Sequence, residues 1–266
     1  MNIPAIAFFN GKGGCGKTTG LINTAGVLSA AGEKILIIDM DKQRNTTDTF
    51  LQNEQSGYDE GISKTLYDVF EGKADLKEVI KKSYFIGIGQ RKPHYYNIDV
   101  IPADVKYQNE NKLKGLKTDI KEDLEKLVDT NGYTYILIDM PPSNEIINNI
   151  CFTQIANNII VPFSPDIFSV SGYNDLMNII SEARHINENL NIIGIYISRY
   201  RNRNYQIKEA LKSFGTMFID EVQIPFSAQI EDTVLEGRPI SYYKRKGKSL
   251  EAFKELTEVM VSRCIV

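Results

Sequence analysis

The residues best suited to chemistry lie in one glycine-rich run, NGKGGCGKTT, between Asn10 and Thr19. The stretch from Gly11 to Thr18 satisfies the pattern GxxxxGK[ST], after an apolar strand and before a helix. Glycines let successive backbone N–H groups close around phosphate oxygens, and Lys17 is placed to reach the β- and γ-phosphates. The Thr18 hydroxyl is expected to bind Mg²⁺. The run predicts a nucleotide-binding loop made of Gly11, Lys12, Gly13, Gly14, Cys15, Gly16, Lys17, Thr18 and Thr19.

Two further groups of polar residues follow apolar runs. Asp39 and Asp41 come at the end of one run, and Asp139 ends another, just before a pair of prolines. A carboxylate at the carboxyl end of a strand beside a phosphate loop can hold a metal ion or a water molecule. Clusters of Asp, Asn and Thr also cap helices, so the residues alone leave both interpretations open.

Short apolar runs alternate with longer helical patterns along the chain. The expected strands are 3–9, 35–39, 98–101, 134–139, 158–162 and 192–198, with a short one suggested at 84–90. The expected helices are 17–31, 64–82, 104–129, 144–155, 168–188, 204–214, 227–236 and 248–262. Several strands are almost continuously apolar, as in parallel sheets covered on both faces. The order predicts an α/β fold, a doubly wound, mostly parallel twisted sheet flanked by helices on both faces, with ligands outside the carboxyl ends of the strands.

Composition excludes several classes of protein. The chain has 266 residues and a formal net charge of −3, which excludes a generally basic coat but not a local basic patch. Its three cysteines, Cys15, Cys151 and Cys264, lack metal-ligand spacing, which argues against a disulfide framework, a zinc site or an iron–sulfur cluster. No apolar run reaches the ~18 residues of a membrane span, and the N-terminus lacks a signal-peptide pattern. We therefore expect a cytoplasmic protein.

The phosphate loop carries a second lysine, Lys12, and KGGCGKTT resembles the deviant Walker A loop, KGGxGKT, of the ParA/MinD family of dimerising ATPases. The resemblance implies that Lys12 reaches the nucleotide of a partner subunit in an ATP-dependent sandwich dimer. The run DMDKQRNTT is similar to the family switch DxDPQxNxT, and DMPPS is similar to the switch DxPPS. By this resemblance Asp41 orients or activates the attacking water, Asp39 supports the loop and the metal, and Asp139 holds Mg²⁺. Lys42 replaces the family's proline, which removes a rigid turn residue.

The resemblance covers nearly the whole chain, from Ile3 to about Glu258. We therefore expect a single P-loop ATPase domain, residues 1–266, without an N-terminal helix-turn-helix extension. Pro225, in the run IPF, corresponds to a family residue near the adenine. The implied protein is a ParA-type ATPase that uses ATP and Mg²⁺ and segregates plasmid or chromosomal DNA. ATP binding drives homodimerisation and nonspecific DNA binding on the nucleoid, and a ParB-like adaptor stimulates hydrolysis and release; no membrane partner is expected.

Two basic clusters interrupt this acidic chain, at residues 199–212 and 238–248. They predict a patch that contacts phosphates without reading bases, the alternative being two solvated loops. Proteins of the family bind DNA through C-terminal basic residues, and the candidates here are Arg199, Arg201, Arg203, Lys244, Arg245, Lys246 and Lys248. The family's stretch IPRNVRL reads IPFSAQI, with Phe226 and Gln229 at two basic positions. The DNA surface is then either displaced onto 244–248 or weakened.

Other functions of related proteins differ in what they require. A MinD-like spatial regulator, cycling on a membrane or protein surface, needs a C-terminal amphipathic helix with a basic face. The tail SLEAFKELTEVMVSRCIV has three acids and two bases, and predicts a packing helix instead. A reductase related to the nitrogenase iron protein needs paired cysteines, which the chain lacks. An amidotransferase-type synthetase and a nonhydrolysing scaffold are further alternatives, the latter because of Lys42.

Overall fold

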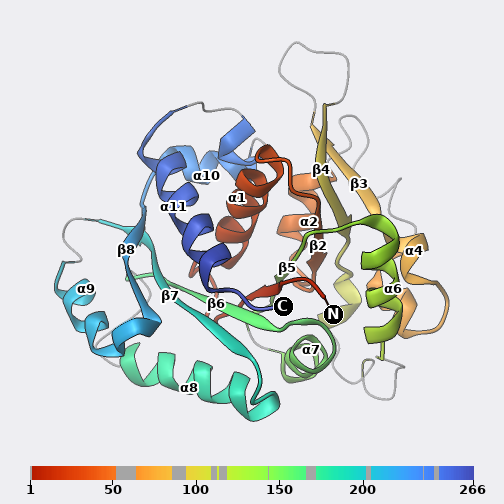
Figure 1. Ribbon diagram of the computed structural model, residues 1–266, viewed down its shortest axis with the longest axis horizontal. Coiled ribbons are helices and arrows are strands. Elements are labelled where there is room, and N and C mark those ends of the chain that lie inside the picture. Colours follow the sequence, from red (N-terminus) through yellow and green to blue (C-terminus); the bar gives the residue numbers. More distant parts are fainter. Residues whose placement is uncertain are drawn as a thin grey trace.

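An eight-stranded sheet forms the centre of the computed structural model (Figure 1). The structure describes residues 2–51, 64–85, 94–108, 113, 119–142, 144–165, 172–201, 205–235, 237–242 and 246–266. In chain order the strands are β1 Ala5–Phe8, β2 Ile35–Asp39, β3 Lys81–Phe85, β4 His94–Ile101, β5 Tyr135–Asp139, β6 Asn158–Phe163, β7 Asn191–Tyr200 and β8 Phe218–Pro225. In space they run β3-β4-β2-β5-β1-β6-β7-β8, and every neighbouring pair is parallel except β3–β4. The expected doubly wound, mostly parallel sheet is confirmed.

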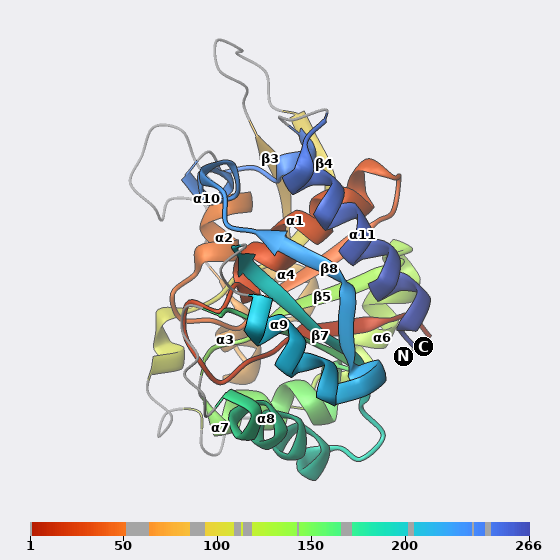
Figure 2. The same cartoon turned by 90° about the vertical axis from the view of Figure 1, so that its left-hand side faces the viewer.

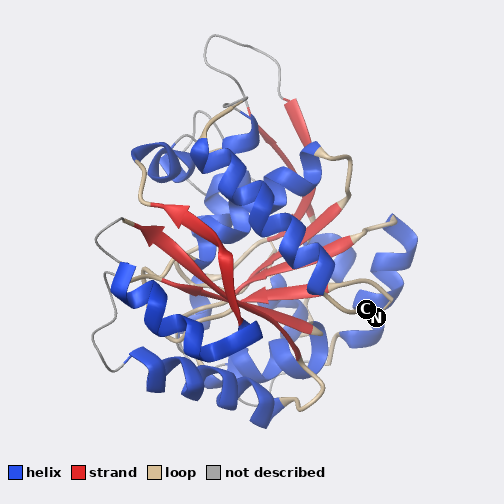
Figure 3. Ribbon diagram, turned by 60° about the vertical axis from the view of Figure 1, so that its left-hand side comes forward, coloured by secondary structure: helices blue, strands red, loops and turns tan. Residues whose placement is uncertain are grey.

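Helices cover both faces of the sheet (Figures 1 and 3). One face carries α1 Lys17–Ala30, α2 Asn45–Phe50, α10 Ala228–Leu235 and α11 Lys248–Arg263. The other carries α3 Leu66–Phe70, α4 Leu76–Val79, α6 Lys121–Asn131, α7 Glu145–Ile150, α8 Gly172–Ile186 and α9 Tyr205–Leu211. Figure 2 shows α7 and α8 together on the second face, and α1 and α11 together on the first.

Alternating side chains of the central strands supply two separate cores. On β1, Ile6 and Phe8 belong to the core under α1 and α11, whereas Ala5 and Ala7 belong to the core under α6, α7 and α8. All four are fully buried, because successive side chains of a strand point to opposite faces. Continuous apolar runs in the sequence therefore mark the strands that are covered twice.

Two expected helices are wrong in part. The pattern at 64–82 divides into α3 and α4, each begun by its own capping box at Thr65 and Asp75, and β3 already starts at Lys81. In 104–129, a 3₁₀ turn at Val105–Gln108 comes first and α6 begins only at Lys121. Residues 109–112 and 114–118 lie outside the described part of that pattern.

The other expected elements agree more closely with the structure, apart from their ends. The helix expected at 144–155 is α7 continued by a π-turn, Cys151–Ile155. Of the short strand suggested at 84–90, only its first two residues lie in β3, and 86–90 fall outside the described residues. Strand β8 is not among the expected strands, because FIDEVQIP places an acidic pair in the middle of its apolar pattern. It adds to β7 at the edge of the sheet.

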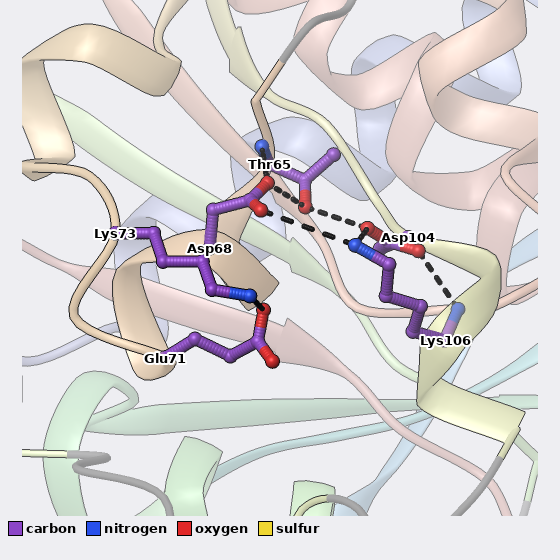
Figure 4. A network of polar contacts seen from close by, with 6 residues as sticks. All are labelled: Thr65, Asp68, Glu71, Lys73, Asp104 and Lys106. Atoms are coloured by element: carbon purple, nitrogen blue, oxygen red, sulfur yellow. Dashed lines mark hydrogen bonds and ion pairs between the residues drawn. The ribbon is translucent and has the colours of Figure 1, made fainter.

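A polar network ties the start of α3 to the loop after β4 (Figure 4). Thr65 N donates to Asp68 Oδ2 at 2.7 Å, and Thr65 Oγ1 lies 3.0 Å from Asp104 Oδ2. Lys106 Nζ lies 3.5 Å from Asp104 Oδ2 and 3.9 Å from Asp68 Oδ1. These contacts fix the loop that follows β4 beside the carboxyl end of β2, to which β4 is paired.

The last helix, α11, packs on the first core rather than standing apart. Leu250, Phe253, Leu256 and Met260 share one buried face against α1 and β8. The expected packing helix is confirmed. None of the helices that the structure describes is long and apolar enough to cross a lipid bilayer.

Candidate functional site

The phosphate loop lies at the carboxyl end of β1 and closes around the Lys17 ammonium. Gly16, with a φ of 95°, precedes α1, and a Cβ there would approach Ser198 Cβ to 3.0 Å, so this turn requires glycine. Lys17 Nζ donates to the carbonyl oxygens of Asn10 and Lys12, at 3.0 Å each. The Asn10 side chain accepts from Lys12 N at 2.9 Å and donates to a carbonyl of β6 at 2.8 Å. The loop is therefore held in shape by its own polar groups.

The loop leaves room for a bound group. A Cβ built on Gly13 meets nothing within 4 Å, and one on Gly11 meets only the carbonyl oxygen of Pro142 at 3.5 Å. The space beside these two glycines is therefore not filled by the atoms of the chain that the structure describes. Helix α1 directs its unpaired N–H groups and positive dipole end into the same region. This arrangement suits an anion such as a phosphate.

Cys15 fills the middle of the loop as a small side chain. It is 1 % exposed, and burial raises the pKa of its thiol despite the neighbouring Lys17. A thiol with a raised pKa is a poor nucleophile. The structure therefore agrees with a packing role for this residue.

Two buried aspartates stand side by side at the ends of β2 and β5. Asp39 and Asp139 are register partners, and each is at most 1 % exposed. Asp39 Oδ1 accepts from Asp41 N at 3.0 Å, and Asp39 Oδ2 accepts from Thr47 N at 2.8 Å and Thr47 Oγ1 at 2.7 Å. Thr47 Oγ1 accepts in turn from Ala103 N at 3.0 Å. Burial, together with the Asp139 carboxylate, raises the pKa of Asp39. Both oxygens of Asp39 thus hold the loop between β2 and α2.

Asp139 differs because one of its oxygens is left open. Its Oδ2 accepts from Thr18 Oγ1 at 2.8 Å and Thr46 Oγ1 at 2.7 Å. Its Oδ1 is buried and has no hydrogen-bond partner among the residues that the structure describes. Burial raises the pKa of Asp139 to about 6, against the opposing effect of the two threonine hydroxyls. A buried, unsatisfied carboxylate oxygen is costly for a protein unless a ligand takes it up.

This donor set fits Mg²⁺. The ion binds few protein carboxylates in nucleotide sites, takes the remaining ligands from water and phosphates, and accepts a hydroxyl from a phosphate loop. Thr18 and the open oxygen of Asp139 supply the hydroxyl and the carboxylate. In the described part of the chain, no group of three or more His, Cys, Asp and Glu side chains could hold a metal by itself.

Asp41 lies at the rim of the same site and is 8 % exposed. Its Oδ1 accepts from Gln43 N at 3.0 Å, and exposed Lys42 stands beside it on the rim. Lys12 is half-buried within the phosphate loop. The handling of water by Asp41 and the reach of Lys12 toward a second copy stay predictions.

A cavity of about 380 Å³ extends from the phosphate loop to an apolar end between β7, β8 and α11. Helix α1 passes so close to β7 that a Cβ on Gly20 would lie 2.2 Å from Tyr196 Oη. The side chains that line the apolar end are Ile224, Pro225, Phe226, Ile230 and Phe253. Pro225 therefore lines the same cavity as the phosphate loop, and its expected place beside an adenine stays a prediction. An apolar pocket beside a phosphate loop is a surface against which a nucleotide base can pack.

Two of the expected DNA-binding arginines, the last but one residue of β7 and the residue after the strand, lie over one aromatic ring at the rim of this cavity. Arg201 Cζ lies 3.8 Å and Arg199 Cζ 5.0 Å from the centre of the Phe226 ring. Arg199 has a positive φ of 54° and pairs with Glu231 at 3.4 Å. Since Arg199, Phe226 and Glu231 also line the cavity, these two arginines are neighbours of the nucleotide site.

The remaining basic candidates are placed differently. Lys246 and Lys248 are exposed at the start of α11. Lys208 and Lys212, which share the first basic cluster, both pair with Asp220, at 3.0 and 4.0 Å. Arg203, Lys244 and Arg245 lie outside the described residues.

Three residues of the site carry no assigned role in the sequence analysis. Thr46 and Thr47 stand in the switch run, and their division between two aspartates depends on the register of β2 and β5. Ser198 Oγ lies 2.5 Å from Cys15 O and braces the phosphate loop from β7. Ser198 is 183 positions away in the chain, so no local pattern indicates this contact.

A phosphate loop on the central strand, with carboxylates ending the two strands on one side, defines a P-loop nucleoside-triphosphatase of the α/β class. A family model described as an AAA domain matches residues 3–192. The chromosome partitioning protein ParA of Caulobacter vibrioides is 30 % identical over 275 residues, covering 97 % of this chain and 94 % of that protein. The sporulation initiation inhibitor protein Soj of Bacillus subtilis is 25 % identical and covers 95 % of this chain and 96 % of its own length. The chain belongs to the ParA/Soj family of partition ATPases.

Solved structures share the fold over almost the full length. A plasmid partition protein from Borrelia burgdorferi superposes with a TM-score of 0.71 at 22 % identity, covering 98 % of this chain and 99 % of its own. The cell division ATPase MinD of Pyrococcus furiosus superposes with a TM-score of 0.74 at 23 % identity and the same coverage. Both results confirm the expected fold.

Proposed function

We propose that the protein is an Mg²⁺-dependent ATPase that segregates plasmid or chromosomal DNA by cycling between an ATP-bound homodimer on nonspecific DNA and a released state. The observation that carries the proposal is the open oxygen of Asp139 beside Thr18, at the edge of a phosphate loop that leaves open space beside Gly13. Two structural neighbours support the ligands. MinD of Pyrococcus horikoshii was solved with Mg-ADP, and the cobyrinic acid a,c-diamide synthase of Mycobacterium smegmatis with an ATP analogue and magnesium.

Each residue of the site has a role in this proposal. Lys17 leaves the loop carbonyls and takes the phosphates, while Thr18 and Asp139 hold the ion. Asp41, at the rim, positions the attacking water. Asp39 keeps Asp41 in place through its backbone N–H. Hydrolysis is slow in the isolated protein, because a single aspartate and a metal supply little stabilisation to the transition state.

The position of the phosphate loop at the protein surface supports the proposed dimer. Gly11, Gly13 and Gly14 are exposed, so a second copy can approach the phosphates through this side. Lys12 then contributes its charge to the nucleotide of the partner. A ParB-like adaptor bound to DNA stimulates hydrolysis, which releases the dimer from the nucleoid.

The DNA surface is centred on the start of α11 rather than on β7. Lys246 and Lys248 are exposed, whereas Arg199 and Arg201 contact Phe226 at the nucleotide cavity. Exposed lysines give the sequence-independent, salt-sensitive contacts that nonspecific DNA binding requires. The two arginines instead make DNA affinity sensitive to nucleotide, since they lie between the cavity and the surface.

The MinD-like alternative gains no support from α11. Its apolar face is already buried against α1 and β8, so inserting that face into a membrane would expose the core. Binding to liposomes in place of DNA is nevertheless the result that would favour it.

The test is binding to nonspecific duplex DNA at moderate salt, with ATP–Mg²⁺, ADP–Mg²⁺ and no nucleotide compared. We expect binding with ATP–Mg²⁺ alone. In a variant that carries Lys246→Ala and Lys248→Ala, the affinity for DNA should fall. The slope of log affinity against log salt concentration should fall in magnitude by about 2, about one for each lost phosphate contact. The matched control carries Lys121→Ala and Lys126→Ala in α6, on the opposite face of the sheet from α11. Its DNA affinity and its salt dependence should both be those of the parent protein. No binding in any nucleotide state, with ATP still bound, would contradict the proposed matrix.

A further inference from the structure

Two residues that follow β4, Ala103 and Asp104, contact the nucleotide site and the start of α3 at the same time. Ala103 N donates to Thr47 Oγ1 at 3.0 Å, and Asp104 Oδ2 accepts from Thr65 Oγ1 at 3.0 Å. Thr47 belongs to α2, and Thr65 is the first residue of the capping box of α3. The proposed ATPase cycle assigns no role to either residue of the pair. We call residues 103–104 the β4 clamp.

The clamp completes a chain of hydrogen bonds that ends at Asp41. Ala103 N donates to Thr47 Oγ1, which donates to Asp39 Oδ2 at 2.7 Å. Asp39 Oδ1 in turn accepts from Asp41 N at 3.0 Å. The direction at the hydroxyl is fixed, because an amide N–H only donates and leaves the hydroxyl hydrogen for the aspartate. The clamp therefore orients the hydroxyl that holds Asp39 and, through it, the backbone of Asp41.

The contacts of the clamp lie in the interior of the protein. Ala103 and Thr47 are fully buried, and Thr65 and Asp104 are 7 % and 8 % exposed. A buried N–H or carboxylate that loses its partner is costly, because little water reaches it in exchange. The folded chain therefore keeps these hydrogen bonds together.

Asp104 is the residue that fixes the clamp in place. Its Oδ1 accepts from Lys106 N at 2.8 Å, which turns the chain, and its Oδ2 lies 3.5 Å from Lys106 Nζ (Figure 4). Its contact with Thr65 adds a bond to α3. The next residue, Val105, is 52 % exposed and begins a 3₁₀ turn. Polar contacts of Asp104, more than apolar packing of the turn, therefore set the place of the Ala103 N–H.

We infer that Asp104 is a positioning residue for ATP hydrolysis, which acts through the β4 clamp and Thr47 on Asp41. The inference rests on the proposed function, because it requires Asp41 to position the attacking water. Misplacing a reacting group by about 1 Å can lower a rate by about 10²-fold, so the hold on this loop matters for turnover.

Nucleotide binding should depend little on the clamp. Lys17 is held by the carbonyl oxygens of Asn10 and Lys12, and Thr18 by Asp139, none of which belongs to the chain of bonds from Asp104 to Asp41. We therefore expect a loss at Asp104 to lower kcat and to leave KM for ATP unchanged.

Steady-state phosphate release by the full chain, at varied ATP with Mg²⁺, tests this separation. Asp104→Ala should lower kcat about tenfold, a part of the loss that a misplacement of about 1 Å can cause. Asp99→Ala is the matched control: Asp99 lies in β4 and accepts from Tyr133 Oη at 2.7 Å, outside the chain of bonds to Asp41. Its kcat should be that of the parent. Equal losses in both variants would indicate a general loosening of β4 and would overturn the inference.

Asp104→Asn separates the hydrogen bonds from the charge. The new amide nitrogen can donate to Thr65 Oγ1, which still donates to Asp68 Oδ2 at 3.2 Å, while the amide oxygen accepts from Lys106 N. The number of hydrogen bonds is kept and only their charge assistance is lost, so kcat should stay within about threefold of the parent. A loss as large as that of Asp104→Ala would assign the effect to the charge and overturn the positioning role.

A double variant tests the path through Thr47. Thr47→Val already breaks the chain of bonds, so adding Asp104→Ala should leave kcat where Thr47→Val alone places it. Residues that act independently would instead multiply their separate losses. Multiplied losses would therefore overturn the path through Thr47.

Hydrogen exchange at the Ala103 amide, without nucleotide, reports on the clamp independently of turnover. In Asp104→Ala this amide should exchange about tenfold faster than in the parent, because local opening releases it from Thr47. Unchanged exchange, or a parental kcat in Asp104→Ala, would overturn the inference and leave the proposed function standing. A parent protein that hydrolyses no ATP would contradict the proposed function and with it the positioning role, whereas faster exchange would still show that Asp104 holds Ala103 to Thr47.

Discussion

The ends of β2 and β5 carry the same residue type at the same register, yet the two aspartates differ in what surrounds them. Three donors, from Asp41 and Thr47, satisfy both oxygens of Asp39. Two hydroxyls share a single oxygen of Asp139 and leave the other without a partner among the described residues. Both carboxylates are buried and both have raised pKa values, so burial alone does not distinguish them. The supply of donors does.

This difference in hydrogen bonding separates a structural role, which suits Asp39, from a ligand-binding role, which suits Asp139. A carboxylate whose two oxygens both accept hydrogen bonds from the chain stabilises the backbone that donates to it. An open carboxylate oxygen destabilises the isolated chain and is compensated when a ligand arrives. The contacts of Asp39 agree with its expected support of the loop. Its expected support of the metal stays a prediction, and so does the binding of the ion by Thr18 and Asp139.

The largest effect that would sharpen this comparison concerns the neighbour of Asp39. Asp41→Ala should lower the ATP hydrolysis rate by about 10²-fold or more, because general-base groups contribute about 10²–10⁴-fold. Its backbone N–H, and hence the contact with Asp39, is retained. Steady-state phosphate release measures the rate, and binding of a fluorescent ATP analogue provides the control. Undiminished turnover would remove Asp41 from the handling of water.

Asp139→Ala should come next and act on the metal. We expect the gain in nucleotide affinity on adding Mg²⁺ to fall by about 10- to 100-fold, the range typical of altered metal environments. Titration of the ATP analogue with and without Mg²⁺ measures this gain. If Asp39→Ala abolished the gain while Asp139→Ala kept it, the assignment of the two strand ends would be reversed.

Thr47→Val tests the structural role of Asp39, because it removes one of the three hydrogen bonds that this carboxylate accepts. The change leaves the Asp39 carboxylate short of a donor and Ala103 N–H without an acceptor, so the free energy of unfolding should fall by about 1–3 kcal/mol. Urea unfolding measures it. Thr49→Val in the same helix is the matched control, since that hydroxyl only bonds the Asn45 carbonyl one turn back. Equal losses in the two variants would deny Asp39 its anchoring role.

Thr46→Val should give the smallest effect. It removes one of the two hydroxyls on Asp139 Oδ2 but leaves Thr18 in place. The Mg²⁺-dependent gain in nucleotide affinity should fall only a few-fold, corresponding to about 1 kcal/mol for one hydrogen bond. The same analogue titration applies. A loss as large as that of Asp139→Ala would mean that Thr46, rather than the open oxygen, controls the metal.

The parts of the site that follow from sequence are those made by neighbours in the chain. The phosphate loop is one: Gly16 and Lys17 act within a few residues of each other, so their spacing already implies their geometry. The strands β1, β2 and β5 are equally clear, because burial on both faces makes them continuously apolar. Edge strand β8 and the broken pattern at 64–82 lack such a signal, since half-exposed elements mix polar and apolar residues.

The assignment of basic residues shows the opposite case. Arg199 and Arg201 belong to a cluster that predicts a DNA surface, and composition contains nothing to separate them from Lys246. Their contact with Phe226 joins β7 to the residue after β8, and this pairing exists only once the sheet has formed. The distribution of charge along a chain therefore predicts that a basic patch exists. The packing of the folded chain decides which of its basic side chains remain accessible to a partner.

The sequence by itself determined the phosphate loop, the parallel sheet that carries it and the family to which the chain belongs, because each rests on short-range patterns of glycine, charge and apolar periodicity. Only the tertiary structure decided which aspartate has hydrogen bonds on both oxygens and which arginines lie at the rim of the cavity. The contacts of Asp139 depend on hydroxyl groups far away in the chain, those of Thr46 and Thr18, which are 93 and 121 positions from it. The pairing of β2 with β5 brings these groups together, and no short-range pattern in the sequence shows which hydroxyl will meet which aspartate.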